Sequence, residues 1–109
     1  MIGLKRGTVK LVTHQDEWEN EAKRTIKELK DHLGNIAIDI QHVGSTAIAS
    51  IHAKPIIDIA IGVYNLIDII PYIDVLGKNG FIFRGEDVHN QVLFVKGDFE
   101  KAFRTHHIH

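Results

Sequence analysis

Two short stretches of the chain carry the residue types best suited to chemistry. Residues 42–46 read His-Val-Gly-Ser-Thr, and residues 54–61 read Lys-Pro-Ile-Ile-Asp-Ile-Ala-Ile. Gly44 lets the backbone approach an anion closely, while Ser45 and Thr46 offer hydroxyl groups as well as backbone N–H groups. This pattern predicts a phosphate-binding turn, followed by a lysine and a metal-binding acid.

Asp58 stands inside an apolar strand, where a charge is not expected. Burying an unpaired carboxylate costs several kcal/mol, so a metal ion or Lys54 is expected to compensate it. Successive side chains of a strand point to opposite faces, which places the small residues Ala60 and Gly62 on the face of Asp58 and leaves room there for a ligand. The structural alternative is that Asp58 only pairs with Lys54 or accepts backbone N–H groups.

The last residues of the chain supply two more candidate metal ligands. His107 and His109 share one face of an extended segment, while Ile108 points to the other. Two imidazoles so placed can bind one metal together, and they favour Zn, Ni, Cu, Fe or Mn over Mg. If this segment lies beside the central strand, Asp58, His107 and His109 form a two-histidine, one-carboxylate set. The alternative is that they are exposed histidines at the end of a strand.

Two basic side chains flank the predicted phosphate-binding turn. His42 precedes it and is a candidate to contact a phosphate or the site carboxylate, or else a structural histidine at a strand end. Lys54 is a candidate partner for phosphate or for Asp58, and with Asp58 it is a candidate catalytic residue.

The overall composition is that of an ordinary globular domain. The 109 residues, 44% hydrophobic and 25% charged, suffice for one modest core. A net charge of −1 gives no electrostatic reason to expect nucleic acid or an anionic membrane as a partner. The absence of cysteine excludes disulfides and thiolate metal sites. No segment has the length of a membrane span or the apolar region of a signal peptide, so we expect a cytoplasmic location.

Hydrophobic periodicity predicts the elements that position these residues. Apolar residues three and four apart predict a helix over 15–33, and alternation predicts a half-buried strand over 36–43. The nearly continuous apolarity of residues 56–63 predicts a central strand buried on both faces. The other predicted elements are a strand at 9–12, helical turns at 47–53, a helix over 65–78 with Pro71 near its first turn or at a kink, and strands at 81–84, 92–96 and 103–109. This order predicts an α/β fold, a mixed β-sheet with helices packed mainly on one side.

Residues 42–48 (His-Val-Gly-Ser-Thr-Ala-Ile) and 53–59 (Ala-Lys-Pro-Ile-Ile-Asp-Ile) closely resemble the signature of the GrpB family, a branch of the nucleotidyltransferase-fold superfamily. The helix with Trp18 and residues 84–87, 96–98 and 104–109 are also similar to GrpB elements, in the expected order. The resemblance implies a single nucleotidyltransferase-like domain over residues 1–109, an α/β (α+β) fold with a mixed sheet of nucleotidyltransferase type. It also implies that the C-terminal helices of the family are absent, and that surface left exposed could drive homodimerisation.

The resemblance further implies a function. Gly44 and Ser45 map to a turn that holds the phosphates of a nucleoside triphosphate. Asp58 maps to the first acid that binds Mg²⁺ while a hydroxyl attacks the α-phosphorus. The superfamily places a second acid two residues further on, where this chain has Ala60.

We therefore expect a divergent metal-dependent nucleotidyltransferase-like protein that acts on a small soluble acceptor. Its expected cofactor is Mg²⁺, with Mn²⁺ or another transition metal as the alternative, and its expected ligand is a nucleotide. Ala60 favours a second interpretation, a non-catalytic nucleotide- or phosphate-binding module. A third is a structural partner domain.

Overall fold

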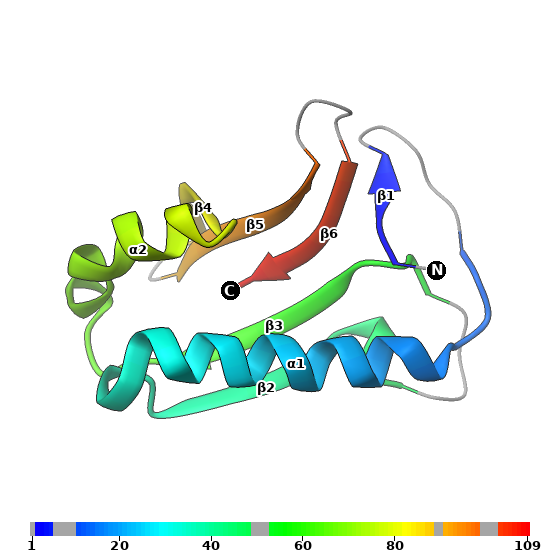
Figure 1. Ribbon diagram of the computed structural model, residues 1–109, viewed down its shortest axis with the longest axis horizontal. Helices are drawn as coiled ribbons and strands as arrows, with labels where there is room; N and C mark the ends of the chain where they lie inside the picture. The colour runs from blue at the N-terminus through cyan, green and yellow to red at the C-terminus, as the bar shows by residue number, and fades with distance from the viewer. Residues whose placement is uncertain (1, 6–10, 49–52, 89–90, 99–102) are drawn as a thin grey trace.

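A mixed β-sheet forms the centre of the computed structural model (Figure 1), which describes residues 2–5, 11–48, 53–88, 91–98 and 103–109. Within these residues the sheet has six strands, in the order β2-β3-β6-β5-β4, with β1 pairing with β6. The pair β3–β6 is parallel and the other pairs are antiparallel. The strands are β1 (Leu4–Lys5), β2 (Asp39–Val43), β3 (Ile57–Gly62), β4 (Ile82–Val88), β5 (Gln91–Asp98) and β6 (Phe103–Ile108).

One long helix, α1 (Asp16–Leu33), lies along β2 and β3 (Figure 1) and confirms the helix predicted over 15–33. Acidic residues in its first turn complement the positive end of the helix dipole. Trp18 and Leu29 of this helix are fully buried, together with Ile57 and Ile59 of β3. Removing such large side chains from water is the main favourable contribution to folding, so this helix–sheet contact forms the core.

The second helical segment differs from the single helix predicted over 65–78. Residues Leu66–Tyr72 form a 3₁₀ helix, η3, and only Ile73–Lys78 form an α-helix, α2. Pro71 lies inside η3. Proline has no N–H to donate and its ring clashes with the carbonyl four residues earlier, so regular α-helical geometry begins only after it.

The two strands on either side of the Gly-Ser turn, β2 and β3, also differ from prediction. The strand predicted over 36–43 begins only at Asp39, because Gly34–Ile36 form a 3₁₀ turn, η1, after α1. The central strand β3 is not buried on both faces: Ile57 and Ile59 face α1, whereas Asp58 and Ala60 are half-buried on the other face. The reason is that α1 covers only one face of this part of the sheet.

The first strand and the segment after the Gly-Ser turn can be compared only in part. Of the strand predicted at 9–12, residues 9–10 lie outside the described residues, Val12 forms an isolated bridge with Ala53, and the first strand is Leu4–Lys5. Of the turns predicted at 47–53, a 3₁₀ helix, η2 (Ser45–Ala47), is present, and residues 49–52 lie outside the described ones. Neither α1 nor α2 is a candidate bilayer span, and no other described helix is.

Candidate metal centre

The parallel pairing of β3 with β6 brings the three predicted metal ligands together. Asp58 is in register with His107, and their side chains lie on the face opposite α1. Asp58 Oδ1 is 3.7 Å from His107 Nδ1 and 3.4 Å from His109 Nε2. One ligand atom from each residue lies within 4.8 Å of those of the other two. The condition set by the sequence, that the last strand lie beside the central one, is therefore fulfilled.

The two distances from Asp58 Oδ1 fit a single small metal ion. Ligands bound at about 2.0–2.1 Å in a tetrahedral site lie roughly 3.4 Å apart, close to the separations of Asp58 Oδ1 from the two imidazoles. Two imidazoles and one carboxylate suit a transition metal better than Mg²⁺, which prefers oxygen ligands. Ala60, two residues beyond Asp58, offers no further ligand. About 28% of the Asp58 side chain is exposed, so the cluster is accessible from solvent.

Gly44 brings the turn directly against Asp58. Its φ of 75° and ψ of −169° belong to a region of backbone conformation that is essentially restricted to glycine. A Cβ at this position would lie 2.7 Å from Asp58 Oδ2. The glycine predicted to allow close approach to an anion thus allows close approach to the carboxylate of the candidate metal cluster.

The two neighbours of Gly44 in the predicted phosphate-binding set lie differently. Ser45 is half-buried at the start of η2. Thr46 is fully buried, and its Oγ1 lies 2.8 Å from His42 Nε2 and donates to the carbonyl of Ile56 at 3.4 Å. The hydroxyl of Thr46 therefore holds the turn together instead of facing a ligand.

His42 is on the opposite face of the sheet from Asp58. In the antiparallel pair β2–β3 it is in register with Ile59, whose side chain is packed beneath α1. It lines a groove of about 340 Å³ between α1 and η2, with His14, Glu19 and Lys23. Burial lowers the pKa of His42, although the charges of Asp58 and Glu19 act in the opposite direction. The structure does not bring His42 into the cluster.

Lys54 also stays apart from the predicted site. It is exposed, ahead of β3, and among the described residues it makes no ion pair with Asp58. The structural alternative of an Asp58–Lys54 pair is therefore wrong for the described residues, and the partners of Asp58 are imidazoles.

Gln91, which the sequence analysis did not identify, contacts the ring nitrogen of His109 that faces away from Asp58. It is the first residue of β5, and its Nε2 lies 3.0 Å from His109 Nδ1. The two nitrogens of the His109 ring thus face Gln91 and Asp58. Only strand alternation, which puts Gln91 on the same face as Val95, the partner of His107, could have suggested it.

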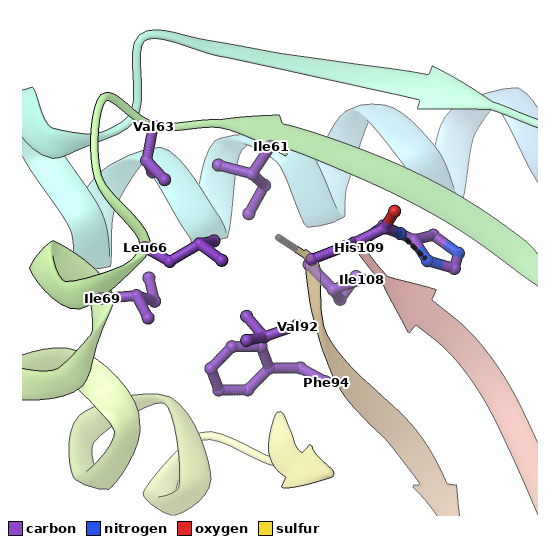
Figure 2. A pocket seen from close by; sticks show the side chains of 9 residues that line it. Ile61, Val63, Leu66, Ile69, Val92, Phe94, Ile108 and His109 are labelled. Atoms are coloured by element: carbon purple, nitrogen blue, oxygen red, sulfur yellow. Dashed lines mark hydrogen bonds between the residues drawn. The ribbon is translucent and has the colours of Figure 1, made fainter. Parts of the chain in front are cut away.

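A small apolar cavity of about 80 Å³ adjoins the backbone of the last residue. Its lining comes from β3, η3, β5 and the end of β6: Ile61, Val63, Leu66, Ile69, Gln91, Val92, Phe94, Ile108 and His109. Figure 2 shows the imidazole of His109 pointing away from this cavity, so the cavity and the candidate metal cluster are separate features.

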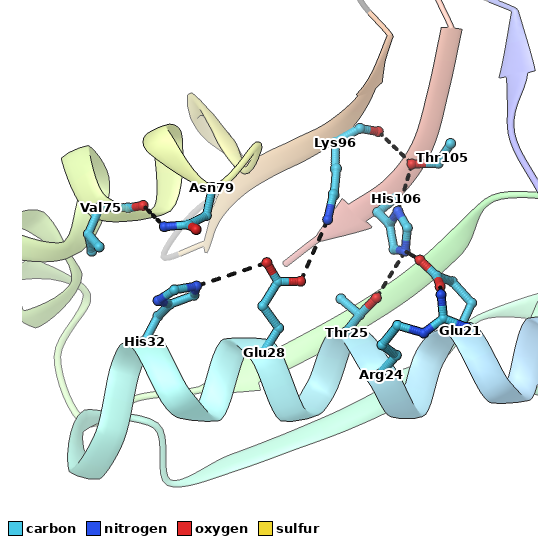
Figure 3. Close-up of polar contacts among 10 residues, drawn as sticks. All are labelled: Glu21, Arg24, Thr25, Glu28, His32, Val75, Asn79, Lys96, Thr105 and His106. Atoms are coloured by element: carbon cyan, nitrogen blue, oxygen red, sulfur yellow. Dashed lines mark hydrogen bonds and ion pairs between the residues drawn. The ribbon is translucent and has the colours of Figure 1, made fainter.

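A partly buried polar network on the α1 side of β6 ties α1 to the strand that carries the two candidate histidine ligands (Figure 3). His106 Nε2 lies 3.0 Å from Glu21 Oε2 and 3.0 Å from Thr25 Oγ1, and its Nδ1 lies 2.7 Å from Thr105 Oγ1. Burial lowers the pKa of His106 to about 4, and the Lys96 ammonium acts in the same direction. The network fixes the position of β6 under α1.

Comparisons with known proteins decide the family. The family model described as GrpB protein matches residues 8–109. This chain belongs to the GrpB family. It is 36% identical over 112 residues to the Glutamate-rich protein GrpB of Alkalihalophilus pseudofirmus, a match that covers 100% of this chain and 64% of that protein.

A solved structure has the same fold. The crystal structure of conserved protein GrpB from Enterococcus faecalis matches with a TM-score of 0.84 and 26% identity, over 92% of this GrpB-family chain and 59% of that one. The family membership and the mixed α/β sheet predicted from the sequence are thus confirmed. The chain spans less than two thirds of the length of these GrpB relatives.

A segment of an enzyme is also similar. A dephospho-CoA kinase of Mycolicibacterium paratuberculosis is 39% identical over 66 residues, which cover 58% of this chain and 16% of the kinase.

Proposed function

We propose that this chain is a metal-dependent nucleotidyltransferase-like protein, which binds a nucleotide through one transition-metal ion and acts on a small soluble acceptor. The observation that carries the proposal is the convergence of Asp58, His107 and His109 within 4.8 Å. A carboxylate and two imidazoles at this separation, on an accessible face, form a donor set with room for further ligands.

The residues around the cluster support a phosphate ligand. Gly44 holds the Gly-Ser turn against Asp58, so that an anion bound to the ion would lie next to the backbone of the turn. Ala60 has only a methyl group and Gly62 has no side chain, so neither fills the sheet face beside Asp58. When bound, a divalent ion supplies positive charge that neutralises phosphate oxygens.

The match to part of a dephospho-CoA kinase favours a nucleotide as the source of the phosphate. That protein is named for the phosphorylation of dephospho-CoA, and the similar segment spans 66 residues, 16% of its length. A nucleotide offers both the phosphates that the ion would bind and a group to transfer.

Ala60 favours the second candidate, a nucleotide-binding module without catalysis. The second acid that the superfamily places at this position is missing, and the buried Thr46 hydroxyl contacts His42. With a single carboxylate, the site is suited to hold a metal–nucleotide complex, whereas two-metal transfer would need another acid.

Calorimetric titration of nucleoside triphosphates, with and without Mn²⁺ or Zn²⁺, tests the proposal. We expect binding that requires the metal and is lost in Asp58→Asn, which keeps the shape of the side chain but removes its charge. Asp39→Asn is the matched control, because Asp39 is an exposed acid of the same sheet face that contacts Gln41. Metal-independent binding, or equal binding by both variants, would contradict the proposal. Incubation of the bound complex with small hydroxyl acceptors then separates transfer from binding alone.

A further inference from the structure

The ring of His109 is held from both sides. Its Nδ1 is 3.0 Å from Gln91 Nε2, and its Nε2 is 3.4 Å from Asp58 Oδ1. Gln91 belongs to β5, whereas Asp58 belongs to β3, so the two contacts reach the ring from strands on either side of β6. This arrangement determines both the orientation of the ring and the place of its proton.

The donors and acceptors of Gln91 and Asp58 determine which ring nitrogen of His109 carries the proton in the metal-free protein. When the amide nitrogen of Gln91 donates to His109 Nδ1, that ring nitrogen is the acceptor. The single ring proton of neutral His109 then resides on Nε2, from which it is donated to the carboxylate of Asp58. Both contacts are satisfied in this tautomer.

Metal binding reverses the requirement at both nitrogens. A metal ligand must present a lone pair, so Nε2 has to be free of its proton and the ring proton moves to Nδ1. The group behind Nδ1 must then accept a hydrogen bond. A glutamine meets both demands, because rotation of its amide replaces the NH₂ group by the carbonyl oxygen.

We propose that Gln91 is the positioning residue of the metal centre: its amide donates to His109 Nδ1 in the metal-free protein and accepts from it when Nε2 binds the ion. This inference rests on the proposed metal site and names a residue through which that site is tuned. Outer partners of metal-binding histidines typically change affinity by about 10–100-fold when removed.

Three variants test the role of Gln91. Gln91→Met keeps the length of the side chain and removes the amide, and Gln91→Glu leaves only acceptors. Gln41→Met is the matched control, since Gln41 is an exposed glutamine on the same sheet face whose amide contacts Asp39. The measurements are Zn²⁺ affinity by competition with a chelator, and the ring tautomer of His109 by ¹⁵N–¹H correlation spectra of the metal-free protein.

We expect a Zn²⁺ affinity at least about tenfold weaker in Gln91→Met, retained in Gln91→Glu and unchanged in Gln41→Met. In the spectra, Nδ1 of His109 should lack a proton in the original protein and carry one in Gln91→Glu, where residue 91 can only accept. A merely structural role would not change the protonation of this nitrogen.

Two failures are distinguishable. If the original protein binds Zn²⁺ but Gln91→Met binds it equally well, or Nδ1 of His109 stays without a proton in Gln91→Glu, the role of Gln91 is overturned and the metal site stands. If the original protein binds neither Zn²⁺ nor Mn²⁺, the proposed function itself is overturned.

Discussion

A methyl group at position 44 would lie 2.7 Å from Oδ2 of Asp58, so Gly44 and Asp58 can occupy their places only because residue 44 has no side chain. Van der Waals contact between such atoms requires considerably more space. The predicted anion-binding glycine is therefore a structural part of the candidate metal centre, because it allows Asp58 to adopt its position.

Gly44→Ala should lower both stability and metal affinity. The φ and ψ of Gly44 cost a residue with a Cβ about 1–3 kcal/mol, and the clash must also displace the Asp58 carboxylate. Urea unfolding and Zn²⁺ titration measure the two effects. Gly34→Ala is the control, because Gly34 also has a positive φ, 56°, but its Cβ would meet nothing within 4 Å. If both variants bind Zn²⁺ like the original protein, the close approach does not matter for the site.

Ala60→Asp should increase the affinity for Mg²⁺. Ala60 shares the face of Asp58, so the new carboxylate would add oxygen ligands, which Mg²⁺ prefers. We expect at least a tenfold gain, about 1.4 kcal/mol, in a Mg²⁺ titration followed by calorimetry. Ala60→Asn is the control, because asparagine has the same shape as aspartate without its charge. Equal Mg²⁺ affinities of the two variants would mean that position 60 does not reach the ion.

Stability should decrease as the pH falls from about 6.5 towards 4, because of His106. The folded pKa of about 4 lies below the usual value of 6.5, so the unfolded chain binds more protons in this window. The contribution of His106 is complete above pH 6.5 and is lost progressively below it, by up to about 3 kcal/mol. Unfolding free energies measured at several pH values in the presence of a chelator test this. His106→Asn should show a shallower slope, and an identical slope would contradict the assignment.

The parts of the fold that the sequence predicted are those with a strong local signal. The apolar residues spaced three and four apart from Trp18 onward predicted α1. The alternation of Asp58 with isoleucines along β3 correctly predicted that Asp58 and the isoleucines lie on opposite faces of the sheet. Pro71 pointed to a disturbance, but its consequence, a 3₁₀ segment before α2, depends on packing over the sheet as well as on proline itself. Local patterns do not contain such tertiary effects.

Residue types and the alternation of side chains along a strand predicted part of the candidate site. Asp58, His107 and His109 were identified, but their meeting depended on strand order, a long-range property that no local pattern determines. For His42 the sequence left a ligand contact and a structural role open, because proximity to the turn along the chain does not specify the face of the sheet. Gln91 carries no chemical signal of its own, since a glutamine at the start of a strand usually faces solvent.

The most direct test of the account is titration of Zn²⁺ or Mn²⁺ into the chelator-treated protein, alongside His107→Ala and His109→Ala. The account predicts one ion per chain and a large loss of affinity in each variant, because both imidazoles lie within 4 Å of Asp58 Oδ1, at 3.7 and 3.4 Å. His32→Ala is the control: His32 lies in the last turn of α1, and this variant should bind the metal like the original protein. No binding by the original protein, or binding unaffected by loss of His107 and His109, would contradict the central claim.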